Sequence, residues 1–124
     1  INMLRTERID NIELLVLDRP DAGNSIGTGL TAALLEKLAL LKTDSQLHAV
    51  IITGAGDKFF CTGGDIKEYQ TIKDKESLNA HFDQTRLIMD TLEGLECPVI
   101  SAINGYALGG GAELLLCTEL SYVR

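Results

Sequence analysis

The hydrophobic and polar positions along the chain follow two periods, one typical of helices and one of strands. Residues 28–41, "TGLTAALLEKLALL", place leucine at i, i+4, i+8 and i+11, which predicts an amphipathic helix. Residues 75–96 predict a longer amphipathic helix, and Pro98 follows its end. The apolar stripe of this second helix consists of Leu78, Phe82, Met89 and Leu92, with Ile88 and Leu95 beside it.

Short apolar runs separate these helices and predict strands. The runs cover residues 11–17, 49–53, 99–103 and 120–123. "AVIIT" and "VISAI", the second and third runs, lack polar alternation, which is typical of strands buried on both faces of a parallel sheet. Strands that alternate with helices indicate an α/β fold with a largely parallel sheet.

Two glycine-bearing segments each follow a predicted buried strand. "GAGDKFFCTGGD" is predicted as a loop leading into a single helical turn, "DIKEYQ", whereas "NGYALGGGAE" leads into a helix over residues 112–117. Ligands of open parallel sheets lie beyond the carboxyl ends of the strands, so both loops are expected to border one crevice. Because glycine lacks a Cβ, its N–H can approach a ligand oxygen closely. Two such N–H groups converging on one oxygen would form an oxyanion hole.

Glu113 is the acidic residue of the second glycine segment. It lies in the first turn of the predicted helix, just after Gly110 and Gly111, where the first N–H groups lack intrahelical partners. A carboxylate there can compensate the helix dipole or cap the helix. It can equally move protons to and from a bound carbonyl substrate. The local sequence leaves both roles open.

The composition limits the class of protein. The chain of 124 residues suits one ordinary domain, and 45% of its residues are hydrophobic. No run approaches the roughly 18 apolar residues of a membrane span, and the polar start "INMLRTERID" is unlike a signal peptide. We therefore expect no membrane partner and a cytoplasmic or mitochondrial matrix setting. The net charge of −7 argues against nucleic-acid binding.

Several alternative sites are excluded by their missing patterns. The three cysteines, Cys61, Cys97 and Cys117, form no CxxC pair and are expected to be buried free thiols, and with only two histidines no metal site is predicted. A nucleophilic role for Cys61 is disfavoured because no histidine lies near it in the sequence. Neither glycine segment contains the Walker, dinucleotide-binding or GxSxG pattern.

These segments together resemble a known family. "AVIITGAGDKFFCTGGDIKEY" and "PVISAINGYALGGGAELLLCTEL" resemble the two hallmark segments of the crotonase, or enoyl-CoA hydratase/isomerase, superfamily, and "LLVLDRPDAGNSI" resembles its opening segment. The resemblance implies a crotonase-like spiral of ββα units, assembled as a trimer or hexamer. It also implies that residues 1–124 are the amino-terminal part of a single acyl-CoA-binding core domain, which ends before the carboxy-terminal helices. Coenzyme A would be part of the thioester substrate, with no separate cofactor.

The resemblance also assigns roles to residues. Gly64 and Gly110 resemble the oxyanion-hole pair; many members have alanine at the position of Gly64, a change that a backbone donor tolerates. Glu113 aligns with the first of two catalytic glutamates of hydratases. The substrate-binding positions implied are Asp65, Ile66, Lys67 and Gly109. Lys67 would lie near the coenzyme A moiety, although a merely solvated lysine is the alternative.

The implied function is that of an enoyl-CoA hydratase of fatty acid metabolism. A glutamate at position 113 favours hydration over isomerisation, and the second catalytic glutamate is expected shortly beyond Arg124. The alternatives are an isomerase, a dehydratase or a ring-cleaving hydrolase of a cyclic acyl-CoA, the last suggested by "FCTGGD" followed by "KEY". A non-catalytic acyl-CoA-binding fragment is a further alternative from a different class.

Overall fold

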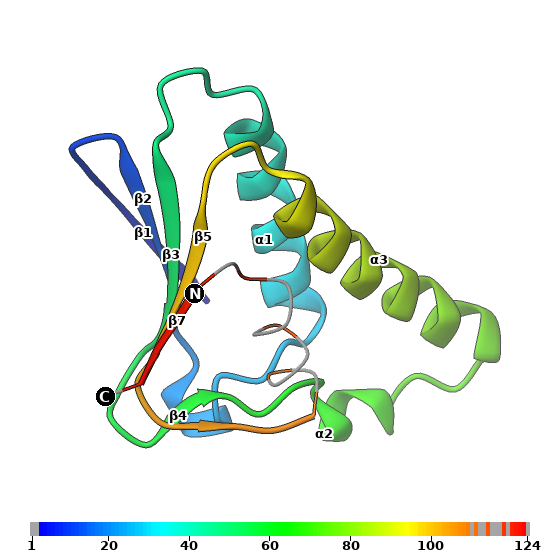
Figure 1. The fold of residues 1–124 in the computed structure, drawn as a ribbon. Helices are drawn as coiled ribbons and strands as arrows, with labels where there is room; N and C mark the ends of the chain where they lie inside the picture. Colours follow the sequence, from blue (N-terminus) through cyan, green and yellow to red (C-terminus); the bar gives the residue numbers. More distant parts are fainter. Residues whose placement is uncertain (1–2, 110, 112–113, 115–117, 119, 124) are drawn as a thin grey trace.

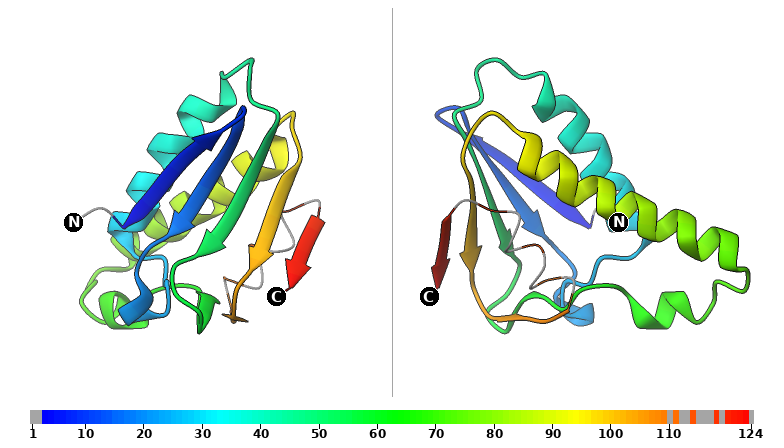
Figure 2. Two further views of the ribbon diagram at one scale, coloured as in Figure 1. Left: turned by 90° about the vertical axis from the view of Figure 1, so that its left-hand side faces the viewer. Right: turned by 45° about the vertical axis from the view of Figure 1, so that its right-hand side comes forward.

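The computed structural model describes residues 3–109, 111, 114 and 118 and the backbone of residues 120–123. A five-stranded sheet has the order β1-β2-β3-β5-β7, which Figure 2 shows strand by strand. Strands β2, β3, β5 and β7 are parallel to one another, whereas β1 is antiparallel to β2. The strands are β1 (Leu4–Ile9), β2 (Ile12–Leu17), β3 (Ala49–Gly54), β5 (Val99–Ile103) and β7 (Leu120–Val123). The predicted α/β fold with a largely parallel sheet is confirmed.

The first strand is one that the hydrophobic pattern did not predict. Of its six residues only Leu4 is buried, because β1 lies at the sheet edge and exposes charged side chains. The strand pairs with β2 from Leu4 opposite Leu17 to Ile9 opposite Ile12. Asp10 and Asn11 connect the two strands with φ of 48° and 65°. A two-residue connection of this kind is typical of a tight hairpin, so Asp10 and Asn11 are the local signal from which β1 could have been predicted.

Two long helices cover one face of the sheet (Figure 1). Helix α1 (Thr28–Lys42) buries the predicted leucine stripe, whose members are Leu30, Leu34, Leu38 and Leu41. Helix α3 (Lys75–Gly94) buries His81, Ile88 and Leu92. The prediction that Phe82 belongs to the buried stripe was wrong, since this side chain is 42% exposed. The first half of α3 projects away from the face of the sheet (Figure 2), so the side of the helix that carries Phe82 borders a pocket rather than the core.

A second, smaller sheet lies beyond the carboxyl ends of the large one. It consists of β4 (Phe59–Cys61) and β6 (Tyr106–Ala107), which pair in parallel. Neither strand was predicted, because two or three residues are too few to show a period. The 3₁₀ turn η1 (Pro20–Ala22) and the short helix α2 (Ile66–Tyr69) lie at the same end, and α2 is the single helical turn that was predicted.

The remaining expectations concern the cysteines, the helix predicted over residues 112–117 and the absence of a membrane span. Cys61 is a buried free thiol, as predicted, whereas Cys97 is only half-buried. Cys117 and most of the helix predicted over residues 112–117 lie outside the described residues. Within the described part of the chain, no helix is both long and apolar enough to cross a bilayer.

Candidate functional site

The two glycine segments meet at the small sheet, as expected. The Leu108 N–H donates a hydrogen bond to the Cys61 carbonyl over 3.0 Å. A Cβ at position 111 would overlap that carbonyl oxygen and lie 2.7 Å from its carbon, so Gly111 is required for this close approach. Gly109 adopts φ of +51°, a left-handed conformation that favours glycine. The second segment therefore lies directly against the first.

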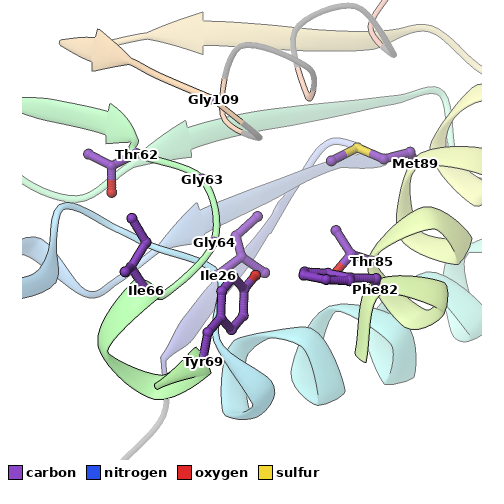
Figure 3. Close-up of a pocket in the computed structure, with 10 residues that line it drawn as sticks. All are labelled: Ile26, Thr62, Gly63, Gly64, Ile66, Tyr69, Phe82, Thr85, Met89 and Gly109. Carbon is purple, nitrogen blue, oxygen red and sulfur yellow. The ribbon is translucent and has the colours of Figure 1, made fainter. Parts of the chain in front are cut away.

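A pocket of about 330 Å³ opens where these segments face α2 and α3 (Figure 3). Most of its side chains are apolar or aromatic, which is typical of a site for an organic ligand. Its lining comprises Ile26, Thr62, Gly63, Gly64, Ile66, Tyr69, Phe82, Thr85, Met89 and Gly109.

Gly64 brings an available backbone donor to this pocket. The preceding residue is held in place because the Ile26 N–H donates to the Gly63 carbonyl over 2.7 Å. Gly64 itself pairs with Ile26 in an isolated parallel bridge, and its own N–H donates to no acceptor among the residues the structure describes. An N–H group that is not used internally can bind a ligand oxygen.

Asp65 does not line the pocket, and its carboxylate holds the turn that contains Gly64. Its carboxylate accepts a hydrogen bond from the Glu68 N–H over 3.2 Å, which caps α2, and forms an ion pair with Arg19 at 3.1 Å. Partial burial would raise the pKa of Asp65, but the Glu68 N–H and the Arg19 guanidinium outweigh it, so the pKa lies below its usual value. Arg19 also donates to the Ser25 carbonyl over 2.8 Å. The ion pair therefore joins the segment after β2 to the site.

Glu68 makes a second connection from α2. Its carboxylate accepts a hydrogen bond from the Thr28 N–H over 3.1 Å and another from the Thr28 hydroxyl. The residue at the N-cap of α1, Gly27, has no side chain with which to cap that helix. Glu68 therefore supplies the hydrogen-bond acceptor that the first N–H group of α1 lacks within its own helix, and it anchors α2 beside α1.

Two asparagines hold the loop that leads to Gly64. Asn24 is fully buried and donates to the carbonyls of Ala55 and Phe59 over 3.1 and 2.9 Å. Asn104 donates to the Phe59 carbonyl over 3.0 Å and accepts from the Gly54 N–H over 3.0 Å. These side-chain amides therefore bind backbone groups at the end of β3, in the following loop and in β4. Sequence reasoning missed both roles, which depend on partners distant in the chain.

Tyr69 also lines the pocket, although the sequence assigned it no specific role. Its hydroxyl lies against Gly64, at the place that a Cβ on residue 64 would occupy. Its ring packs edge-on against His81 and Phe82, with centroids 5.3 and 5.4 Å apart. Burial raises the pKa of the Tyr69 phenol, and the neighbouring Glu68 and Asp65 carboxylates raise it further.

The predicted site residues thus divide into three groups. Gly64, Ile66 and Gly109 line the same pocket. Asp65 and Lys67 lie beside it without lining it, and Lys67 is exposed to solvent. Gly110 and Glu113 lie outside the described residues. In the part of the chain that is described, no group of three or more His, Cys, Asp or Glu side chains could hold a metal ion.

Comparisons with known proteins match this architecture. The family model described as "Enoyl-CoA hydratase/isomerase" covers residues 7–124. The mitochondrial enoyl-CoA hydratase of Pongo abelii is 36% identical over 91% of this chain and 38% of its own length. The (E)-benzylidenesuccinyl-CoA hydratase of Thauera aromatica is 33% identical over 90% of this chain and 43% of its own length.

Solved structures agree with the sequence comparisons. The crystal structure of enoyl-CoA hydratase from Bacillus anthracis superposes with a TM-score of 0.92 at 33% identity, over 98% of this chain and 47% of that one. The chain therefore has the crotonase fold and spans less than half the length of these relatives. Since the family model covers nearly every residue, this chain belongs to the enoyl-CoA hydratase/isomerase family.

Proposed function

We propose that the protein is an enoyl-CoA hydratase, which adds water across the double bond of a 2-enoyl-CoA thioester. The observation that carries this proposal is the Gly64 N–H, a pocket donor without an acceptor among the described residues. Such a donor can bind the thioester oxygen as negative charge develops on it. The two relatives named as hydratases support water addition as the reaction.

In this proposal Gly110 supplies the second donor. It directly follows Gly109, which lines the same pocket as Gly64. With both N–H groups on the thioester oxygen, electrons are drawn from the conjugated double bond and C3 becomes electrophilic. The water oxygen bonds to C3, Glu113 takes a proton from that water, and the π electrons move onto the thioester as an enolate. Protonation at C2 then restores the carbonyl, with a second acid expected outside this sequence.

The remaining site residues take supporting roles. Ile66 and Gly109 border the acyl group, and the exposed Lys67 is available to the coenzyme A phosphates. Asp65 was expected on the substrate side, but its carboxylate is engaged by Arg19 and the Glu68 N–H. In the proposal it holds the turn that presents Gly64. Coenzyme A enters as part of the substrate, and a trimeric or hexameric assembly belongs to the same proposal.

Crotonyl-CoA hydration by the full-length protein, followed as loss of the enoyl thioester absorbance, tests the function. We expect Glu113→Gln to lower the rate by about 10²–10⁴-fold, as for a lost proton-transfer group. Glu93→Gln, on the exposed face of α3, is the matched control and should keep the wild-type rate. Full hydration by Glu113→Gln would remove the role of Glu113. If the protein turns over a cyclic oxoacyl-CoA but does not hydrate crotonyl-CoA, it is a hydrolase and not a hydratase. If it binds these thioesters without turning any of them over, it is an acyl-CoA-binding protein.

A further inference from the structure

The side-chain wall that α2 and α3 contribute to the pocket contains two hydroxyl groups. Its members are Ile66, Tyr69, Phe82, Thr85 and Met89. The Thr85 hydroxyl donates to the His81 carbonyl over 3.2 Å, within its own helix. The Tyr69 hydroxyl has no hydrogen-bond partner among the described residues. It is therefore the polar group of this wall that remains available to a ligand.

The position of this hydroxyl is set by Gly64. Any side chain at position 64 would collide with the phenol, because a Cβ there would overlap the hydroxyl and approach the ring carbons Cζ and Cε2 to 2.6 and 2.7 Å. Figure 3 shows the Tyr69 side chain rising from α2 into the space between the turn at Gly63–Gly64 and α3. The glycine thus lets the phenol reach the same part of the pocket as the Gly64 N–H.

The phenol is also held in this place. The neighbouring rings of His81 and Phe82 both pack edge-on against the phenol ring, and contacts of this type stabilise its position. Helix α2 is itself anchored through Asp65 and Glu68. Because burial and the nearby carboxylates raise the pKa of Tyr69, the hydroxyl keeps its proton at neutral pH. It is a prepositioned hydrogen-bond donor.

We propose that Tyr69 is a specificity-determining residue, whose hydroxyl donates a hydrogen bond to an oxo or hydroxyl oxygen carried by the acyl chain of the substrate. This inference rests on the proposed function, since it requires an acyl thioester in this pocket. A plain hydrocarbon chain would displace water from the phenol without replacing its hydrogen bond, which is unfavourable. Sites built to pair with a substrate oxygen discriminate against analogues that lack it for this reason. The pocket therefore favours oxygen-substituted acyl groups.

The test compares two thioesters of equal carbon count, acetoacetyl-CoA and butyryl-CoA, which differ by one oxo oxygen. Dissociation constants of the full-length protein are measured by calorimetry for wild type, Tyr69→Phe and Tyr106→Phe. Tyr69→Phe removes only the hydroxyl and keeps the ring contacts with His81 and Phe82. Tyr106, on β6, is 64% exposed and outside the pocket lining, so Tyr106→Phe is the matched control.

Wild type and Tyr106→Phe should bind acetoacetyl-CoA more tightly than butyryl-CoA. In Tyr69→Phe this preference should shrink about 2- to 10-fold, the effect of one hydrogen bond, with butyryl-CoA affinity unchanged or improved. An unchanged preference, or an equal loss for both ligands, would overturn the specificity role while leaving acyl-CoA binding intact. Failure of the wild-type protein to bind either thioester would overturn the proposed function, and this inference with it.

Discussion

Replacement of Gly64 by alanine should destabilise this protein, although a backbone donor by itself would tolerate the change. The added methyl group would overlap the Tyr69 hydroxyl and meet two of its ring carbons at 2.6 and 2.7 Å. Overpacking of this kind costs about 1–3 kcal/mol. If the ring instead moves away, two aromatic contacts of about 0.5–1.5 kcal/mol each are lost. Both routes predict a loss of about 1–3 kcal/mol in the free energy of unfolding.

A double-mutant cycle assigns this loss to Tyr69. Urea unfolding of the full-length protein at fixed concentration is measured for Gly64→Ala, Tyr69→Ala and the double variant. In the Tyr69→Ala background the collision is absent, so Gly64→Ala should cost close to nothing and the coupling energy should be about 1–3 kcal/mol.

Gly94→Ala provides the control, because Gly94 is the last residue of α3 and an added Cβ there would meet nothing within 4 Å. This variant should be neutral or stabilised by up to about 1 kcal/mol. If Gly64→Ala costs the same with and without the Tyr69 ring, the collision is not its cause and the reasoning fails.

Two further predictions concern stability. Because the folded-state pKa of Asp65 lies below its ordinary value, the stabilisation it provides is present above pH 4 or so and is lost as pH falls through the folded pKa. In Asp65→Asn the free energy of unfolding should therefore decrease less between about pH 5 and pH 2 than it does in the wild type. Parallel plots of this free energy against pH for the two proteins would contradict the prediction. His81 is 3% exposed, and both of its ring nitrogens lack a hydrogen-bond partner in the described structure. His81→Leu should raise the melting temperature, because removing an unpaired buried polar group, worth about 1–3 kcal/mol, outweighs the lost ring contact with Tyr69, worth about 0.5–1.5 kcal/mol. A lower melting temperature would contradict this and indicate that the imidazole has a partner in the full-length protein.

Local patterns in the sequence predicted most of the main elements. The leucine period predicted α1 almost residue for residue, and the apolar runs predicted β3, β5 and β7. The glycine segments predicted that two loops would border one pocket. Each of these inferences depends on the period of a short segment or on the backbone freedom of glycine, which neighbouring residues in the chain largely determine.

The parts that were missed depend on partners far away in the chain. Arg19 and Asp65 are 46 positions apart, and no local pattern marks their ion pair. The short strands β4 and β6 exist because each supplies the other with backbone partners. The buried face of α3 likewise depends on where the helix leaves the sheet, which decided between His81 and Phe82.

The sequence by itself determined the family, the order of the two long helices and the longer parallel strands, and the presence of a glycine-lined pocket with Gly64 on its wall. Only the tertiary structure decided that the Tyr69 phenol occupies the space beside that glycine. The physical reason is steric: whether a Cβ fits at position 64 depends on a side chain from α2 that His81 and Phe82 of α3 hold in place.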